Sequence, residues 1–182
     1  LPRLSPRPMK VNEIKQPVIS LNGTWKFTGG NAVDKNIKVP GEWEMQGFHV
    51  DSAAVGNYSR RFLLPADWQN KSIKLRFDGV SSYCVVRING KEIGRHEGSF
   101  VPFELDITGE GKPGSNTLEV AVQCQTISDI LACTSQYAGH PVGGILRKVT
   151  LFALPSVNIA DMTYTTRFDK DYRNAVLQSP FA

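Results

Sequence analysis

Histidines, cysteines and carboxylates are the side chains of this chain that could carry out a reaction. The 182 residues include three histidines, three cysteines and 17 acids. A serine hydrolase holds its nucleophile on a sharp turn with a histidine in reach, and no Gly-x-Ser-x-Gly segment occurs. Glycoside cleavage with retention needs two carboxylates about 5 Å apart, and no pair of acids stands out from the others. The sequence therefore predicts no catalytic residue in this chain.

Metal binding and disulfide pairing depend on the spacing of cysteines and histidines. Zinc takes three or four ligands at short spacing, whereas the only cluster in the sequence is Cys124, Cys133 and His140. We therefore expect neither a metal nor a cofactor. Cys84 lies in an apolar run and is expected in the core, where a free cysteine behaves as a small apolar residue. Cys124 and Cys133 could pair, but nothing in the sequence requires it.

The charge pattern argues against a nucleic-acid partner. The formal net charge is 21 − 17 = +4, and the basic residues are scattered among the acids rather than gathered on one face. No apolar run approaches the roughly 18 to 20 residues of a membrane span, so we expect no membrane contact. Three Asn-x-Ser/Thr sequons matter only on a secretory route: Asn22, Asn57 and Asn70. A periplasmic or secreted location is slightly favoured over the cytoplasm, and the compartment stays open.

Two segments without a regular period contain the polar and aromatic side chains that could bind a ligand. The first, residues 40–56, carries Trp43 among glycines and polar groups. The second, residues 125–145, carries four further candidates: Asp129, Gln136, Tyr137 and His140. Long loops on a rigid β-scaffold are where binding groups usually lie. We therefore expect any ligand contacts to come from these two segments.

Most of the remaining chain alternates apolar and polar residues with a period of two, which is typical of half-buried antiparallel strands. The clearest runs are residues 25–27, 58–62, 73–77 and 118–122. Residues 83–88 are apolar on both faces except for Arg87, which predicts a central strand. Asn89-Gly90 follows and predicts a hairpin turn, because both positions favour positive φ. No convincing amphipathic helix occurs, so the sequence predicts an all-β sandwich or barrel.

The chain divides into three parts. Residues 1–14 form a leader, residues 15–155 the sandwich, and residues 156–182 a fresh alternation that then turns polar. Two strands cannot close a core of their own. We therefore expect 156–182 to be the incomplete start of a second β domain, whose unpaired strands could associate with a neighbouring chain.

Four segments in series resemble the sugar-binding domain that begins enzymes of glycoside hydrolase family 2, the β-galactosidase and β-glucuronidase family. The first reads Ile-Ser-Leu-Asn-Gly-Thr-Trp-Lys-Phe at 19–27, and the second reads Val-Pro-Gly-Glu-Trp-Glu-Met-Gln-Gly-Phe at 39–48. The third spans 56–94 and includes Phe-Asp-Gly-Val at 77–80, and the fourth runs from 103 to Gly-Gly-Ile-Leu-Arg-Lys-Val at 143–149. Order and spacing are similar over about residues 18–154.

The resemblance implies a jelly-roll sandwich of the galactose-binding-domain type, followed by the truncated start of an immunoglobulin-like domain. The family's two catalytic glutamates lie on a barrel that would follow, so the role implied for this chain is accessory. It would shape the sugar pocket and dock the catalytic barrel of a retaining β-glycosidase. The partners implied are a weakly bound carbohydrate and that barrel.

The family also implies roles for the candidate residues, because loops of its first domain help to hold the terminal sugar. Asp129 and Gln136 would bond hydroxyls, Tyr137 and Trp43 would stack on the sugar, and His140 would be a further contact. Each has an ordinary alternative: Trp43 closing the sandwich end, Tyr137 packing in its own loop, Asp129 capping a turn, and His140 bonding its loop. The long loop that some β-galactosidases carry before Gly56 is short here, which argues against β-galactosidase specificity.

Two other functions stay open at this stage. The same fold can serve as a stand-alone carbohydrate-binding module, which would need an aromatic platform of its own. A purely structural β-sandwich would have no sugar contact at all.

Overall fold

The computed structural model describes residues 17–51, 54–158 and 164–178, so the predicted leader lies outside the described residues. The first strands are β1 (Val18–Ser20), β2 (Gly23–Gly29), β3 (Ala32–Val39), β4 (Val55–Leu64), β5 (Lys71–Phe77), β6 (Val80–Ser81) and β7 (Tyr83–Ile88). The later strands are β8 (Lys91–Glu97), β9 (Phe103–Asp106), β10 (Gly114–Gln123), β11 (Gly144–Ile145), β12 (Val149–Pro155), β13 (Thr165–Phe168) and β14 (Ala175–Gln178). The helical elements are η1 (Glu44–Gln46), η2 (Ala66–Trp68), α1 (Ile127–Ala132) and α2 (Thr134–Ala138).

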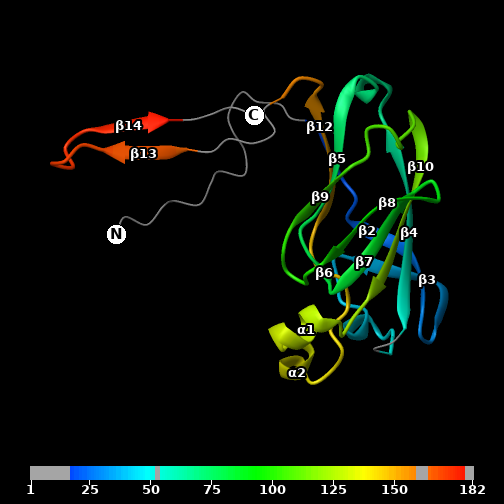
Figure 1. Cartoon of the computed structure of the whole chain (residues 1–182). Helices are drawn as coiled ribbons and strands as arrows, with labels where there is room; N and C mark the ends of the chain where they lie inside the picture. Colours follow the sequence, from blue (N-terminus) through cyan, green and yellow to red (C-terminus); the bar gives the residue numbers. More distant parts are fainter. Residues whose placement is uncertain (1–16, 52–53, 159–163, 179–182) are drawn as a thin grey trace.

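Two antiparallel sheets pack face to face as a sandwich (Figure 1). One has the strand order β1-β12-β5-β9, and the other has the order β3-β2-β4-β10-β7-β8. The long strand β10 organises the larger sheet: it pairs with β4 from Gly114↔Leu64 to Gln123↔Val55 and with β7 on its other side. The prediction of an all-β sandwich is therefore confirmed.

The residues that alternate in the sequence fill one continuous core between the sheets. In β10, for example, Leu118, Val120 and Val122 are buried while Glu119 and Ala121 between them are only partly covered. The largest fully buried side chains come from both sheets and from the segments between them: Trp25, Trp43, Tyr58, Phe27 and Phe77. Burying a side chain of this size contributes about 1.5–3 kcal/mol relative to leaving it exposed, so the alternation itself supplies much of the driving force.

The predicted hairpin is present. Asn89 and Gly90 have φ of 52° and 83°, and they connect β7 to β8 in antiparallel register. The strand β7 lies between β10 and the edge strand β8, so it is an inner strand of its sheet but not the predicted central one.

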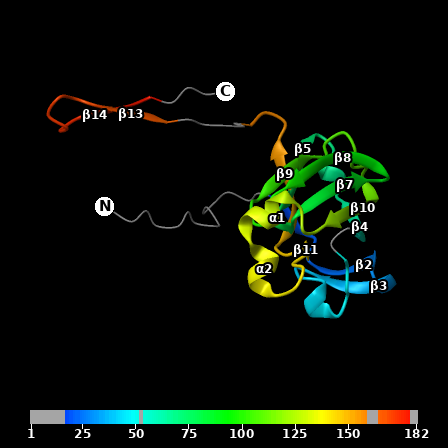
Figure 2. The ribbon, with the colours of Figure 1, turned by 60° about the horizontal axis from the view of Figure 1, so that its bottom comes forward.

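The segment 125–145 departs from the prediction, because it contains α1 and α2 rather than a loop without helix. Both helices are very short, and each ends at a residue in the left-handed region, Cys133 with φ 52° and Gly139 with φ 74°. Helices of one or two turns leave too few residues for a period of 3.6 to be recognised. Figure 2 places them at one end of the sandwich, near β11.

After Pro155 the chain forms the hairpin β13–β14, paired from Thr165↔Gln178 to Phe168↔Ala175. Both views place it away from the sandwich (Figures 1 and 2). All eight strand residues are exposed, including three large apolar ones: Phe168, Val176 and Leu177. Whether residues 156–182 begin a second domain, and whether they self-associate, stay predictions.

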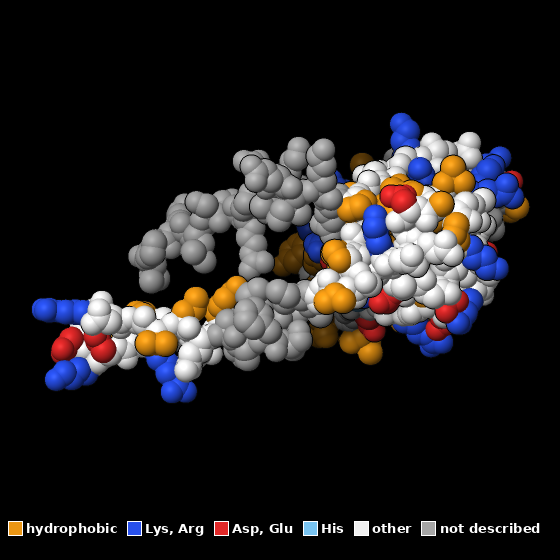
Figure 3. Space-filling model, turned by 90° about the horizontal axis from the view of Figure 1, so that it is seen from above, with side chains coloured by type: hydrophobic (Ala, Val, Ile, Leu, Met, Phe, Trp, Pro, Cys, Tyr) orange, Lys and Arg blue, Asp and Glu red, His pale blue; other side chains and the backbone are white. Residues whose placement is uncertain are grey.

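Seen from the end opposite α1 and α2, side chains of both charge signs are scattered over the sandwich (Figure 3). Among the described residues, no helix is both long enough and apolar enough to cross a membrane.

Candidate functional site

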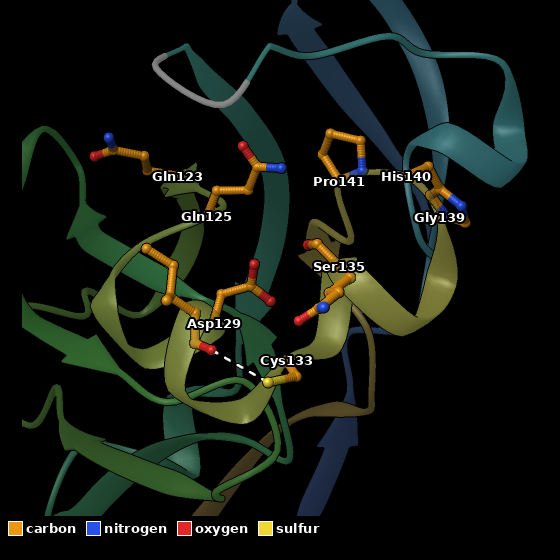
Figure 4. Close-up of a pocket in the computed structure, with 10 residues that line it drawn as sticks. Gln123, Gln125, Asp129, Cys133, Ser135, Gly139, His140 and Pro141 are labelled. Atoms are coloured by element: carbon orange, nitrogen blue, oxygen red, sulfur yellow. Dashed lines mark hydrogen bonds between the residues drawn. The ribbon is translucent and has the colours of Figure 1, made fainter.

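A hollow of about 780 Å³ opens beside α1 and α2 (Figure 4). Its lining residues come from the end of β10, both helices and the segment after them: Gln123, Gln125, Asp129, Ile130, Cys133, Ser135, Gln136, Gly139, His140 and Pro141. Three of the five predicted site residues, Asp129, Gln136 and His140, therefore line one hollow. Tyr137 and Trp43 do not line it.

Asp129 is the buried acid of this hollow. It lies in the first turn of α1, and only 3% of its surface is exposed. Within the part of the chain that the structure describes, its Oδ1 atom has no hydrogen-bond partner. A buried polar atom without a partner costs about 1–3 kcal/mol, and such atoms are rare in native proteins. In Figure 4 the carboxylate points into the hollow, where a ligand donor could satisfy it.

The base of α1 is held by contacts to Ser82, between β6 and β7, and to Glu97, the last residue of β8. The hydroxyl oxygens of Ser82 and Thr126 lie 2.6 Å apart, and the Ser128 N–H donates to Glu97 Oε1 at 3.3 Å. These contacts attach the helix that carries Asp129 to the sandwich, so the carboxylate is positioned by a rigid support.

His140 connects the lining of the hollow to the 40–47 segment, which contains Glu42. Its Nε2 lies 2.5 Å from Glu42 Oε1, and its Nδ1 lies 3.1 Å from the carbonyl oxygen of Ala138. The carboxylate and carbonyl oxygens both accept hydrogen bonds, and the tautomer decides which ring nitrogen donates. The side chain therefore fastens the lining of the hollow to the 40–47 segment rather than reaching into open space.

Trp43 lies in the core, with 0% of its surface exposed. Gly143 and Gly56 pack directly on its ring: a Cβ added to them would lie 1.9 Å from Cζ2 and 2.7 Å from Cζ3, respectively. The backbone N–H of Trp43 also donates to the Gly143 carbonyl at 3.1 Å. In this structure no face of the indole is open to a sugar, and the residue closes the end of the sandwich.

Tyr137 is the opposite case, because 89% of its surface is exposed on α2. An exposed ring is available for stacking, but it does not line the hollow that contains Asp129.

Sequence reasoning did not select several of the lining residues. Gln125 has φ 52° and directs its amide toward the hollow (Figure 4). Ser135 accepts a hydrogen bond from the Val142 N–H at 2.9 Å and so fixes the far wall. The one available signal was the position of Gln125 just after a predicted strand, where binding groups often occur.

A second hollow of about 470 Å³ adjoins the first, and the two share Gln125 and Pro141. Its other lining residues belong to the 44–51 segment: Glu44, His49, Val50 and Asp51. The Nδ1 atom of His49 lies 2.6 Å from Glu44 Oε1.

The three cysteines are free thiols. Burial raises the pKa of Cys84 to about 12 and that of Cys124 to about 11, so neither is a thiolate near neutral pH. Cys133 is partly exposed at the wall of the first hollow. In residues 17–51, 54–158 and 164–178 the structure contains no cluster of three or more His, Cys, Asp or Glu side chains able to hold a metal.

Comparison with known proteins decides the family. Residues 47–155 match the family described as "Glycosyl hydrolases family 2, sugar binding domain". The chain belongs to this family. The family 2 chain is 28% identical over 197 aligned residues to the β-galactosidase of Priestia megaterium and 30% identical over 156 to the β-glucuronidase of Bacteroides fragilis. These alignments cover 87% and 81% of this chain but only 19% and 22% of the two relatives.

Solved structures agree on the fold of the family 2 chain. A β-glucuronidase of Ruminococcus gnavus superimposes with a TM-score of 0.72 at 25% identity, covering 96% of this chain and 34% of that one. The β-D-glucuronidase of Dictyoglomus thermophilum superimposes with a TM-score of 0.71 at 22% identity, over 95% of this chain and 33% of that one, which shows the fold alone. The predicted resemblance is confirmed, and the chain spans about a fifth of the length of the curated relatives.

Proposed function

We propose that this chain is the non-catalytic N-terminal domain of a retaining family 2 β-glycosidase, where it forms one wall of the sugar pocket and docks the catalytic barrel. The observation that carries the proposal is the Asp129 carboxylate, which is buried, aimed into the hollow and without a partner at Oδ1 among the described residues. An acceptor held in this way fits a sugar hydroxyl, which would donate to it.

The surrounding side chains fit the same kind of ligand. The amides of Gln125 and Gln136 can both donate to and accept from hydroxyls, and they line the hollow together with Asp129. Tyr137 supplies an exposed aromatic ring on α2 next to this lining. The hollow is open, so a sugar would touch this chain on one side only. We therefore expect the chain alone to bind a monosaccharide more weakly than about 1 mM.

The docking role is supported by apolar side chains on α1 and α2 that have no cover. Four of them are between 66% and 89% exposed: Ile127, Ile130, Leu131 and Tyr137. Residues 124–146 contain no Lys or Arg, and their one acid is the buried Asp129. The centre of a protein interface is likewise apolar, with few charged residues. The relatives extend far beyond the matched region, and in a full-length enzyme the barrel would cover this face.

Sugar binding is tested by NMR titration of the 182-residue chain with methyl β-glycosides. Asp129→Asn replaces the carboxylate by an amide of the same shape and should abolish the shift changes around the hollow. Asp67→Asn, on η2 at the other end of β4, is the matched control and should leave them intact. No shift change in the unaltered chain would contradict the pocket-wall role and favour a purely structural sandwich. Micromolar binding would instead favour a stand-alone carbohydrate-binding module.

The absence of catalysis is tested separately with a panel of nitrophenyl glycosides. We expect no turnover by the pure chain. Robust hydrolysis that survives further purification would contradict the assignment as a non-catalytic domain.

A further inference from the structure

We infer that the pocket wall formed by this chain selects uncharged sugars over sugar carboxylates such as uronates. The inference rests on the proposed function and adds a substrate class to it. It concerns the two adjoining hollows, which share Gln125 and Pro141.

The charge around the two hollows differs from that of the whole chain. The chain as a whole is basic, with a formal net charge of +4, yet the two segments that supply every lining residue except Gln123 contain no Lys or Arg. These segments are residues 39–59 and 124–146. Together they carry four acids: Glu42, Glu44, Asp51 and Asp129. Three of the four line the hollows, and the fourth, Glu42, is bonded to the lining residue His140.

Two histidines can offset part of this negative charge. His49 pairs with Glu44 and His140 pairs with Glu42, at 2.6 and 2.5 Å. With both rings neutral the four acids sum to −4, and with both rings protonated the sum is −2. The wall is negative in either state. For Asp51 and Asp129 the described part of the chain supplies no ion-pair partner, so their charges are not compensated locally.

Asp129 is the acid whose geometry bears most directly on a ligand. Its buried Oδ1 is satisfied only by a ligand atom that donates a hydrogen bond. The hydroxyls of a neutral sugar and of a uronate can both donate to it, so the two differ in the carboxylate, which donates no hydrogen bond and brings a second negative charge into the same hollow. Repulsion between like charges is stronger in such a partly desolvated site than in water and is weakened by salt.

Methyl β-D-glucopyranoside and methyl β-D-glucuronide form a matched pair of probes, because they differ only in a CH₂OH group against a carboxylate. We expect NMR titration of the full chain to show about tenfold tighter binding of the glucoside at low salt. The difference should narrow in about 0.5 M salt, where the Debye length is only a few ångströms. The double variant Glu44→Gln/Asp51→Asn removes two of the lining charges and should reduce the preference for the glucoside over the glucuronide severalfold. Asp67→Asn should change neither affinity.

A second measurement reports the negative potential without a sugar. Cys133 lies at the wall of the first hollow, while Cys84 and Cys124 are buried. Anionic iodoacetate and neutral iodoacetamide both alkylate thiols. The ratio of the iodoacetate rate to the iodoacetamide rate should therefore be several times lower at Cys133 than in a free cysteine peptide. Salt and the double variant should both reduce this discrimination.

The outcomes separate the inference from the proposed function. Glucuronide binding as tight as glucoside binding at low salt, or no discrimination between the two alkylating reagents, would overturn the inference and leave the pocket-wall role standing. If neither sugar shifts any resonance near the hollows, the proposed function fails and the inference fails with it.

Discussion

The Nε2 atom of His140 lies 2.5 Å from Oε1 of Glu42, and this contact joins segments that are 98 residues apart in the sequence. The next residue after Glu42 is the buried Trp43, and three residues after His140 comes Gly143, whose backbone lies on the indole ring. A further link is the Gly41 N–H, which donates to the Ile145 carbonyl at 2.9 Å. The two segments are thus attached side to side, and the second of them supplies His140 and Pro141 to the lining of the hollow.

Gly143→Ala should destabilise the fold, because the added Cβ would lie 1.9 Å from Cζ2 of the fully buried Trp43 ring. Overpacking of this kind usually lowers the free energy of unfolding by about 1–3 kcal/mol. Urea unfolding followed by tryptophan fluorescence measures the change. Gly109→Ala is the control, since nothing lies within 4 Å of its added Cβ. Equal stability of the two variants would contradict the close packing.

Glu42→Gln should weaken the contact to His140 and loosen the 138–143 segment. Hydrogen bonds to charged groups contribute about 1.5–3 kcal/mol, and both partners are largely covered. Glu44→Gln offers a comparison, because it breaks the pair with the mostly exposed His49 and should cost less than about 1 kcal/mol. Amide hydrogen exchange of residues 138–143 is the readout, and we expect it to be faster in the Glu42 variant than in the Glu44 variant. The reverse order would contradict the prediction.

Asn116→Asp should destabilise the loop before β10. The Asn116 amide donates to the carbonyls of Lys112 and Gly114 at 2.6 and 3.0 Å, and its oxygen accepts from Lys112 N–H and Asn89 Nδ2 at 2.9 Å each. An aspartate cannot donate, so two carbonyls would face a carboxylate, with an expected loss of about 2–3 kcal/mol. The exposed Asn70→Asp is the control in thermal unfolding. A melting temperature equal to that of the control would show that the network is dispensable.

Asp106 should contribute to stability in acid. The hydrogen bond from Lys74 Nζ at 2.8 Å, followed by that from the Thr108 hydroxyl, lowers the pKa of this carboxyl from 3.8 to about 2. Because the pKa is lower in the folded state than in the unfolded state, the ionised carboxylate stabilises the fold at pH values above the unfolded-state pKa. This contribution is lost as the pH falls from about 4 to 2. Asp106→Asn should therefore flatten the fall in unfolding free energy over that range. Urea titrations at pH 5, 3.5 and 2.5 test it, and an unchanged slope in the variant would refute the assignment.

The three thiols should differ in reactivity. Burial raises the pKa of Cys84 to about 12 and that of Cys124 to about 11, while Cys133 is partly exposed. Because the thiolate is the nucleophile, a disulfide reagent at pH 8 should label one thiol quickly in the native chain and three after unfolding. Cys133→Ser should remove the fast phase. Fast labelling that persists in this variant would mean that a buried cysteine is accessible.

The sequence by itself determined the parts of this protein that depend on near neighbours. The alternation of residues 118–122 decides which side of β10 is buried, and Asn89-Gly90 decides the turn, because both act through the backbone of the same few residues. The serial order of the family segments determined the fold as well, as the match over residues 47–155 confirms.

Only the tertiary structure decided how the candidate residues are arranged. It brought Asp129, Gln136 and His140 to one hollow, buried Trp43 beneath Gly143, and left Tyr137 exposed. It also formed α1 and α2, which are too short for a periodic signal in the sequence. The physical reason is that these outcomes depend on contacts between distant parts of the chain. Local alternation and turn chemistry carry no information on which distant segment will cover a given side chain.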